Sequence, residues 1–171
     1  MIDNDVILVD EQDNPIGVEE KLAAHKKGLL HRAFSVFVFN SKGELLIQKR
    51  AKAKYHSGGL WTNTCCSHQA PGEETVAAAH RRLKEEMGFD CDVREISSLL
   101  YKTSFDNGLI EHEFDHILIG IYNGPIDHVN PDEAEDFKWI TPDELLANMK
   151  KSPFSFTYWF RLSIRDVLEK R

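Results

Sequence analysis

The sequence predicts an α+β fold in which a mixed or largely antiparallel β-sheet is flanked by helices. Strands outnumber helices among the expected elements, hairpin turns connect most of the strands in the first two-thirds, and the clearest helical pattern lies in the middle of the chain. The 171 residues fit one domain, residues 1–171, with N-terminal and C-terminal extensions. A domain of this length buries about 68–70% of its unfolded surface, so a substantial core is available.

The first 50 residues predict strands, a short helix and a hairpin. An apolar run at 6–9 predicts a strand, and the polar, Pro- and Gly-containing stretch at 10–17 predicts a turn. A short helix is expected over 18–25, ended by Gly28. The Phe- and Val-rich run at 32–39 predicts a buried strand, and after a turn its return strand is expected at 45–50.

The remaining residues predict the best helix of the chain and a long hairpin. A strand is expected at 60–68, and a helix at 73–87 because apolar positions recur at helical spacing before Gly88. Strands at 93–105 and 111–122 flank the turn signal Asp106-Asn107-Gly108. The final expected elements are a strand at 137–140, a helix from the capping box at Thr141 through Met149, and a helix at 155–168.

Composition argues against two broad classes of function. The chain carries 21 Lys and Arg against 28 Asp and Glu, a formal charge of −7, so it lacks the positive field that nucleic-acid binding requires. Its apolar runs are far too short to cross a bilayer, and the acidic start lacks the features of a signal peptide. The odd number of cysteines, Cys65, Cys66 and Cys91, fits free thiols in a reducing compartment. We therefore expect a cytoplasmic protein without nucleic-acid or membrane partners.

The helix at 73–87 carries charges at a regular spacing. Arg82 and Glu86 lie four residues apart on one face, as do Arg81 and Glu85. Carboxylates beside a phosphate-binding site hold Mg²⁺, which prefers oxygen ligands. The alternative interpretation is a solvated helix with ordinary ion pairs.

Two further segments contain residue types suited to proton transfer or metal binding. Cys66 and His68 share one face of the strand expected at 60–68, and a thiol can donate or accept a proton. The alternative is a small buried cysteine and a structural histidine. On the strand at 111–122, alternation places Glu111, Glu113 and Asp115 on one face, where carboxylates can bind a divalent metal or simply face solvent.

Isolated histidines and a short basic run complete the candidates. Taken alone, His25 and His31 are expected to be surface histidines, because six residues separate them and no helix face unites them. The basic run at 49–54 is a candidate clamp for phosphate.

Residues 67–89 resemble the Nudix box, a motif of the Nudix superfamily. The matching positions are Glu73, Arg81, Leu83, Glu85, Glu86, Gly88 and Phe89. Ser67 replaces the first glycine of the motif, and Arg82 replaces a glutamate that normally binds metal. Because Arg82 puts a cation in that position, the chain is not expected to act as an ordinary diphosphate hydrolase.

From Val6 to Trp159 the chain resembles the type 1 isopentenyl-diphosphate isomerases of the Nudix superfamily. The segments that carry the resemblance are Trp61-Thr62-Asn63-Thr64-Cys65-Cys66-Ser67-His68, Glu111-His112-Glu113, Lys21-Leu22-Ala23-Ala24-His25, His31-Arg32-Ala33-Phe34-Ser35 and Arg50-Ala51-Lys52-Ala53-Lys54. These isomerases also have an arginine at the position of Arg82. The resemblance implies a Nudix-type fold and the interconversion of isopentenyl and dimethylallyl diphosphate through a carbocation-like state.

The resemblance also implies the roles of individual residues. Cys66 and Glu113 match the essential pair on opposite sides of the isoprenyl pocket, and Tyr101 matches a tyrosine that assists proton transfer. The implied ligands of a buried divalent metal (Mn²⁺, Zn²⁺ or Mg²⁺) are His25, His31, His68, Glu111 and Glu113. Glu86 matches the ligand of a second ion, Mg²⁺ bound with the substrate diphosphate. The implied substrate contacts are Lys21, Arg50, Lys54, Arg82 and, over the carbocation, Trp159.

The residues and the resemblance leave three functions to compare. The main expectation is an isomerase acting on a small isoprenyl diphosphate, as a monomer or weak dimer. A Nudix hydrolase is the first alternative, and it would leave Cys66 without a role. A zinc-stabilised binding module is the weaker alternative, because Cys65 and Cys66 are adjacent and no second closely spaced pair exists.

Overall fold

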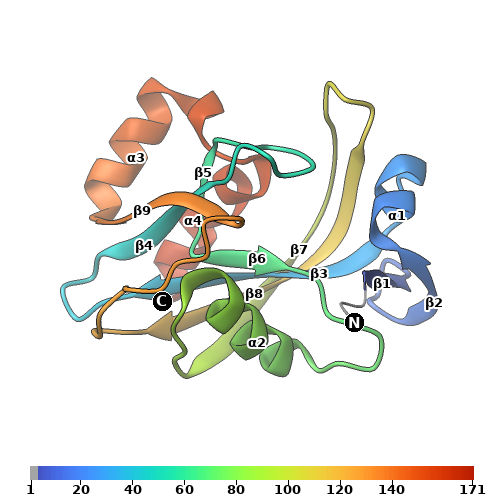
Figure 1. Cartoon of the computed structure of the whole chain (residues 1–171), viewed down its shortest axis with the longest axis horizontal. Coiled ribbons are helices and arrows are strands. Elements are labelled where there is room, and N and C mark those ends of the chain that lie inside the picture. Colours follow the sequence, from blue (N-terminus) through green and yellow to red (C-terminus); the bar gives the residue numbers. More distant parts are fainter. Residues whose placement is uncertain (1–3) are drawn as a thin grey trace.

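Residues 4–171 are described by a computed structural model and form nine strands, four α-helices and one short 3₁₀ helix. The elements are β1 (Asp5–Val9), β2 (Pro15–Glu20), α1 (Lys21–Lys27), β3 (His31–Phe39), β4 (Leu45–Arg50), β5 (Trp61–Thr62), β6 (Cys65–Ser67), α2 (Thr75–Met87), β7 (Val93–Ser104), β8 (Ile110–Ile121), β9 (Ala134–Ile140), α3 (Pro142–Lys151), η1 (Pro153–Ser155) and α4 (Tyr158–Lys170). The expected α+β class is confirmed (Figure 1).

Strand β3 is the centre of a mixed sheet. It runs parallel to β8 along its whole length, from His31↔Glu113 to Phe39↔Ile121. It is antiparallel to β6, and β8 pairs in turn with β7 in a long antiparallel hairpin. Because β6 and β8 pair with β3, β4 meets β3 only at Phe39↔Leu45 and pairs mainly with β9. The expected hairpin partner of β3 therefore has its main pairing elsewhere.

The alternation of side chains along β3 divides the core into two layers. Phe37 and Phe39 pack into a cluster with the apolar faces of α3 and α4. Phe34, Val36 and Val38 point to the opposite side and pack against α2. Figure 1 shows α2 on one side of β3 and β6, with α3 and α4 on the other. The sheet is thus covered on both faces, and the functional side chains collect near the N-terminal end of β3.

The two predicted helix signals in the second half are confirmed. Helix α2 ends at Gly88, which adopts a left-handed conformation with φ 73° and donates its N–H to the Lys84 carbonyl. A side chain at this position would collide with the backbone carbonyl of His128. Thr141 caps α3 by accepting a hydrogen bond from the backbone N–H of Glu144 at 3.3 Å.

The expected helix over 18–25 begins later than predicted. Val18 lies in strand β2, which pairs with β1, and the helix begins at Lys21. The helix begins later because the Glu20 carboxylate accepts hydrogen bonds from the backbone N–H groups of Leu22 and Ala23 and so caps its N-terminus. This later start places His25 in the last turn of α1, facing the core.

The expected strand over 60–68 is two short strands with a break between them. At the break, Asn63 donates from its side chain to the carbonyls of Val36 and Cys65, and the Thr64 hydroxyl donates to Leu46 O. Buried side chains thus replace the backbone pairing of a continuous strand. After the break, β6 pairs with β3, and Cys66 on β6 lines the cavity described below.

The last helix also begins later than expected. Residues 153–155 form the 3₁₀ turn η1, and α4 begins at Tyr158. Within residues 4–171, no helix combines the length and apolar character needed to cross a membrane.

Candidate active site and metal centre

A cavity of about 780 Å³ opens at the N-terminal end of β3. Its walls come from α1, the loop after β4, β6, α2, β8 and α4, so segments far apart in the sequence meet there. The sequence-predicted residues among its lining are Lys21, Arg50, Lys54, Cys66, His68, Arg82, Glu86, Glu111, Glu113 and Trp159. Most of the predicted site is therefore assembled in one place.

Four of the predicted metal ligands converge beside this cavity. The ligand atoms of His25, His31, His68 and Glu113 all lie within 4.8 Å of one another. The parallel pairing of β3 and β8 aligns His31 with Glu113, and β6 leads into His68. The expectation that His25 and His31 lie on the surface is wrong, since both are fully buried. Sequence spacing could not reveal this, because the sheet and not a shared helix face unites them.

The hydrogen bonds of the histidine rings suit metal binding. His25 Nδ1 lies 2.7 Å from Lys21 O, and His31 Nδ1 lies 2.9 Å from Leu29 O. A ring that donates from Nδ1 keeps its Nε2 lone pair for a metal. Both Nε2 atoms point into the cluster without a hydrogen-bond partner in the described chain. Burial lowers the pKa of His25 to about 4 and that of His68 to about 3, so both rings are neutral, as metal ligation requires. This donor set fits a divalent metal.

Two carboxylates, Glu111 and Glu113, are joined by the phenol of Tyr101. Glu111, Glu113 and Asp115 are all buried, so the solvated-face alternative is wrong. The Tyr101 hydroxyl contacts both Glu111 Oε1 and Glu113 Oε2. Burial favours the neutral form of Glu113, but its close contacts with the His31 and His68 rings outweigh this effect and hold its pKa well below the usual range. Burial and the Glu113 charge raise the pKa of Glu111.

Asp115 takes a different role from its two neighbours. It accepts a 2.8 Å hydrogen bond from the Ser35 hydroxyl, between β8 and β3. Burial, with the Glu113 charge, raises its pKa well above the usual range. Asp115 therefore links the two central strands and is not part of the metal cluster.

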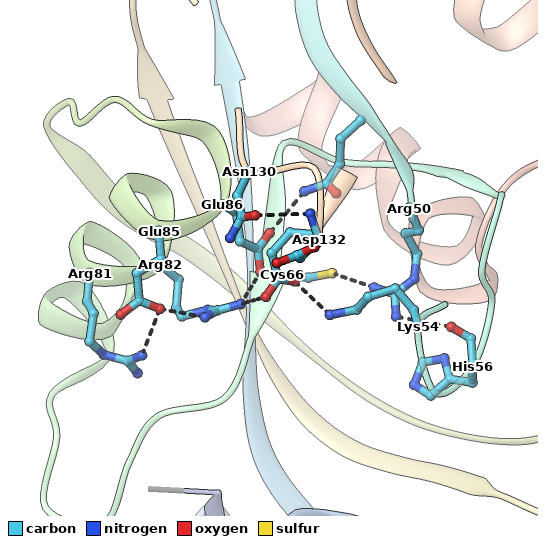
Figure 2. Close-up of polar contacts among 12 residues, drawn as sticks. Arg50, Lys54, His56, Cys66, Arg81, Arg82, Glu85, Glu86, Asn130 and Asp132 are labelled. Carbon is cyan, nitrogen blue, oxygen red and sulfur yellow. Dashed lines mark hydrogen bonds and ion pairs between the residues drawn. The ribbon is translucent and has the colours of Figure 1, made fainter. Parts of the chain in front are cut away.

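Cys66 lies on β6 and lines the cavity. Arg50 Nη1 lies 3.8 Å from its sulfur (Figure 2). Burial raises the pKa of the Cys66 thiol, and the positive charge of Arg50 only partly opposes this effect. The group is therefore a protonated thiol at neutral pH, able to donate a proton.

Cationic side chains gather at the mouth of the cavity. Burial lowers the pKa of Lys21, and the positive charges of Lys54 and Arg82 lower it further. Lys54 is paired with Glu133 at 2.7 Å, and Arg82 contacts the same carboxylate at 3.1 Å. Converging cations of this kind form a binding site for an anion. Glu133 is a residue that the sequence analysis missed, since it stands in the acidic run at 132–136 and nothing in the sequence distinguishes it from its acidic neighbours.

Arg82 and Glu86 form the ion pair expected from their helical spacing, at 2.7 Å (Figure 2). Glu86 is buried and also accepts a 3.0 Å hydrogen bond from the Gln48 side-chain amide. The alternative of an ordinary solvated helix is thus wrong for this face of α2. Arg81, on the neighbouring face, pairs with Glu73 at 2.7 Å, which ties the residues before α2 to the helix.

Trp159 closes the apolar wall of the cavity. It is buried on α4, and its indole N–H donates to Asn63 Oδ1 at 3.2 Å. The Arg50 guanidinium lies 5.3 Å from the centre of its ring. Asn63 therefore holds the edge of the indole ring and Arg50 lies over its face, and the ring contributes a π surface to the site.

The fold and the Nudix-box segment together define a class of protein. The family profile of the NUDIX domain matches residues 29–160. Among solved structures, DR0079 from Deinococcus radiodurans superposes with a TM-score of 0.70 at 21% identity, covering 86% of this chain and 89% of that one. A MutT NUDIX hydrolase from Burkholderia pseudomallei gives a TM-score of 0.63 at 20% identity, covering 80% of this chain and 96% of that one. The chain has a Nudix fold.

Sequence relatives narrow the class. Isopentenyl-diphosphate Delta-isomerase 2 of Aromatoleum aromaticum is 50% identical, covering 99% of this chain and 89% of that protein. Isopentenyl-diphosphate Delta-isomerase of Pectobacterium atrosepticum is 53% identical, covering 95% of this chain and 90% of that protein. The chain therefore belongs to the isopentenyl-diphosphate Delta-isomerase family of Nudix proteins.

Proposed function

We propose that this protein interconverts isopentenyl diphosphate and dimethylallyl diphosphate. The observation that carries the proposal is that a protonated thiol, Cys66, and a hydrogen-bonded acid–base group around Glu113 open into one cavity with a cationic mouth. Moving the double bond requires a proton to be added to the alkene and a different proton to be removed from a neighbouring carbon. Two proton-transfer groups facing one substrate serve this sequence.

The proposed acid–base groups are Cys66 on one side and Glu113 with Tyr101 on the other. The thiol is held in its protonated form, and the carboxylate is held in its ionised form by the histidines. Tyr101 bridges Glu111 and Glu113, so it can pass a proton between these carboxylates. Because the reaction is reversible, each side acts as acid in one direction and as base in the other.

We assign the buried metal to His25, His31, His68, Glu111 and Glu113, and its identity to Mn²⁺, Zn²⁺ or Mg²⁺. A divalent cation bound there would stabilise the ionised carboxylates and tune the acidity of their neighbours. The residues' own part is to hold Glu113 in place, with His68 Nε2 at 3.1 Å from Glu113 Oε1, and to exclude water by burial.

The cationic mouth is proposed to bind the diphosphate, through Lys21, Lys54 and Arg82. Mg²⁺ bound with the substrate is assigned to Glu86, whose carboxylate faces the same cavity. Arg50 lies deeper, between Cys66 and Trp159, and we assign it to the substrate as well as to the thiol. Binding the diphosphate firmly supplies the energy that positions the alkene between the two proton-transfer groups.

Trp159 is proposed to stabilise the carbocation-like state through its π face, worth ~2 kcal/mol in a desolvated site. Its ring cannot turn freely, because Asn63 holds the indole N–H. The same apolar wall would keep water from the cation.

We further propose that the protein works in the cytoplasm as a monomer or weak dimer. The location is supported by its thiols, since Cys65, Cys66 and Cys91 are all free. A thiol used as a proton donor must stay reduced, which a reducing compartment ensures.

A Nudix hydrolase is the second candidate, supported by the matching domain. Arg82 argues against it, because its guanidinium occupies the place of a metal-binding carboxylate and is paired with Glu86.

One measurement separates the two activities: ¹H and ³¹P NMR of isopentenyl diphosphate with the protein and Mg²⁺ in D₂O. Isomerisation gives deuterated dimethylallyl diphosphate without phosphate release. Release of phosphate with the alkene unmoved would overturn the proposal.

A further inference from the structure

His56 is a buried histidine that belongs to no motif and lies in the loop between β4 and β5. Its ring is stacked on Phe105, with ring centres 4.4 Å apart and planes inclined by 9°. Tyr55 and Trp159 meet it edge-on at 4.3 and 5.7 Å. Figure 2 shows His56 beside Arg50, whose guanidinium donates to its backbone carbonyl at 3.1 Å. Three aromatic rings thus hold the imidazole in one position.

The free ring nitrogen of His56 points toward the carboxylates of the site. His56 Nε2 lies 2.9 Å from Glu111 Oε2. Despite this distance, neither atom has a properly aligned hydrogen bond to any described residue. With His25 they form a second group of buried ligand atoms, all within 4.8 Å of one another.

A second histidine–glutamate pair, already assigned to the metal, has the same combination of a short nitrogen–oxygen distance and no aligned hydrogen bond. His31 Nε2 lies 3.3 Å from Glu113 Oε1, and that Nε2 also lacks an aligned hydrogen bond among residues 4–171. In a hydrogen bond the N–H points at the oxygen, whereas two ligands of one ion direct their lone pairs at a third point between them. Ligand atoms ~2.1 Å from an ion and at right angles lie about 3 Å apart, which is the spacing of both pairs.

The two groups of ligand atoms belong to one metal site and not to two. They share His25. Its Nδ1 is hydrogen-bonded to Lys21 O, so only Nε2 remains for a metal. A single ring nitrogen binds one ion. The rings of His25 and His56 are 5.7 Å apart, close to the 5.8 Å between His25 and His68.

We propose that His56 is a further ligand of the buried metal, on the side of Glu111. The inference rests on the metal site of the proposed function and extends its donor set to four histidines and two glutamates. Four imidazoles select a transition metal such as Zn²⁺ over Mg²⁺, which prefers oxygen ligands. The site is then built for an ion different in kind from the Mg²⁺ that accompanies the diphosphate.

The test is the affinity of the full-length protein for Zn²⁺, measured by competition with a chromophoric chelator after metal removal. His56→Gln keeps a side-chain N–H that can still hydrogen-bond Glu111, and His56→Phe removes it. The matched control is His80→Gln, which changes a histidine of α2 that is paired with Asp90 and does not line the cavity. We expect both His56 variants to bind Zn²⁺ at least ~10-fold more weakly, with the control unchanged. The absorption spectrum of the Co²⁺-loaded protein should change in both variants.

Wild-type affinity and an unchanged Co²⁺ spectrum in His56→Gln would overturn the inference, because a hydrogen bond to Glu111 would then explain the contact. A crystal structure of the Zn²⁺-loaded wild type keeps the test decisive if the variants fold poorly. It should place the ion 2.0–2.1 Å from His56 Nε2, and a separation beyond bonding distance would contradict the proposal. Failure of the wild type itself to bind Zn²⁺ would overturn the whole metal assignment, whereas loss of isomerase activity alone would bear only on the proposed reaction.

Discussion

Tyr101 and Glu113 face each other across the β7–β8 pair and are joined by a 2.8 Å hydrogen bond from the phenol hydroxyl to Glu113 Oε2. The same hydroxyl contacts Glu111 Oε1. A phenol has one proton to donate, so at any moment only one of these carboxylates receives it. Burial and the two carboxylates raise the pKa of Tyr101 well above its usual value, so the phenol remains protonated. Tyr101 is thus a permanent donor shared between two acceptors.

Replacing Tyr101 by Phe removes only this hydroxyl. We expect kcat to fall about 10- to 100-fold, the cost of losing an outer partner of a catalytic carboxylate, with little change in KM. Steady-state kinetics with isopentenyl diphosphate measure both constants. Tyr122→Phe is the matched control, since its hydroxyl bonds Pro125 O outside the cavity. Equal kcat values for Tyr101→Phe and the wild type would show that the shared proton has no part in the reaction.

Cys66 supplies the opposite side of the proposed reaction. Because its thiol is protonated and faces the cavity, Cys66→Ala should lower kcat by at least about 10²–10⁴-fold, the range for a lost acid–base group. Metal content and thermal unfolding should stay near the wild type, because within residues 4–171 the sulfur holds no hydrogen bond besides the contact with Arg50. Cys91→Ala, at a partly buried thiol away from the cavity, should keep full activity. A Cys66→Ala variant with more than a tenth of wild-type activity would exclude the thiol as the acid.

Patterns within single elements predicted much of the fold. The apolar spacing of α2, its stop at Gly88 and the Asn107-Gly108 turn all depend on neighbours a few residues apart, which a sequence displays directly. The errors arose where side chains override the backbone pattern. Glu20 caps α1 later than expected, and Asn63 interrupts the strand expected at 60–68.

The site was harder to predict, because sheet pairing creates it. His25 and His31 meet Glu113 only after β3 and β8 pair in parallel, and spacing along the chain contains no trace of that register. The resemblance to known isomerases supplied these residues where spacing could not. His56 had neither signal, since it lies in a loop and outside the segments that carry the resemblance.

The cationic mouth predicts an effect on substrate affinity. Arg82→Gln removes a charge beside Lys21 and Lys54 and should raise KM for isopentenyl diphosphate by about 10- to 100-fold, as expected for the loss of a charged hydrogen bond. kcat should change less, because the role proposed for Arg82 is to bind the diphosphate and not to transfer a proton. Arg94→Gln, on β7 and outside this cavity, serves as the control. An unchanged KM in Arg82→Gln would remove the arginine from the diphosphate site.

The buried histidines predict acid sensitivity of the metal-free protein. Burial lowers the pKa of His68 to about 3 in the folded state, while the unfolded chain has the ordinary value of about 6.5. Between pH 6.5 and 4.5 the unfolded state therefore binds a proton that the folded state does not. Stability falls as the pH falls, with a slope for this group that approaches about 1.4 kcal/mol per pH unit once the pH is well below 6.5.

Chemical denaturation in the presence of a chelator measures this slope. His68→Gln removes the titrating ring, so its free energy of unfolding should fall less steeply than that of the wild type across pH 6.5–4.5. The variant is less stable than the wild type at neutral pH, because Glu113 loses the 3.1 Å hydrogen bond from His68. Parallel curves for the two proteins would contradict the buried neutral ring.

Trp159 offers a graded test of carbocation stabilisation. Trp159→Phe keeps a π face over the cavity but loses the hydrogen bond to Asn63, whereas Trp159→Leu keeps an apolar side chain without π electrons. If the ring contributes ~2 kcal/mol to the cationic state, the leucine variant should lose roughly 30-fold in kcat, and the phenylalanine variant much less. Both substitutions leave space in the core and should lower the melting temperature, so activity is compared at a temperature where both are folded. Packing alone would make the two variants lose kcat equally, and that result would assign Trp159 to the core rather than to the reaction.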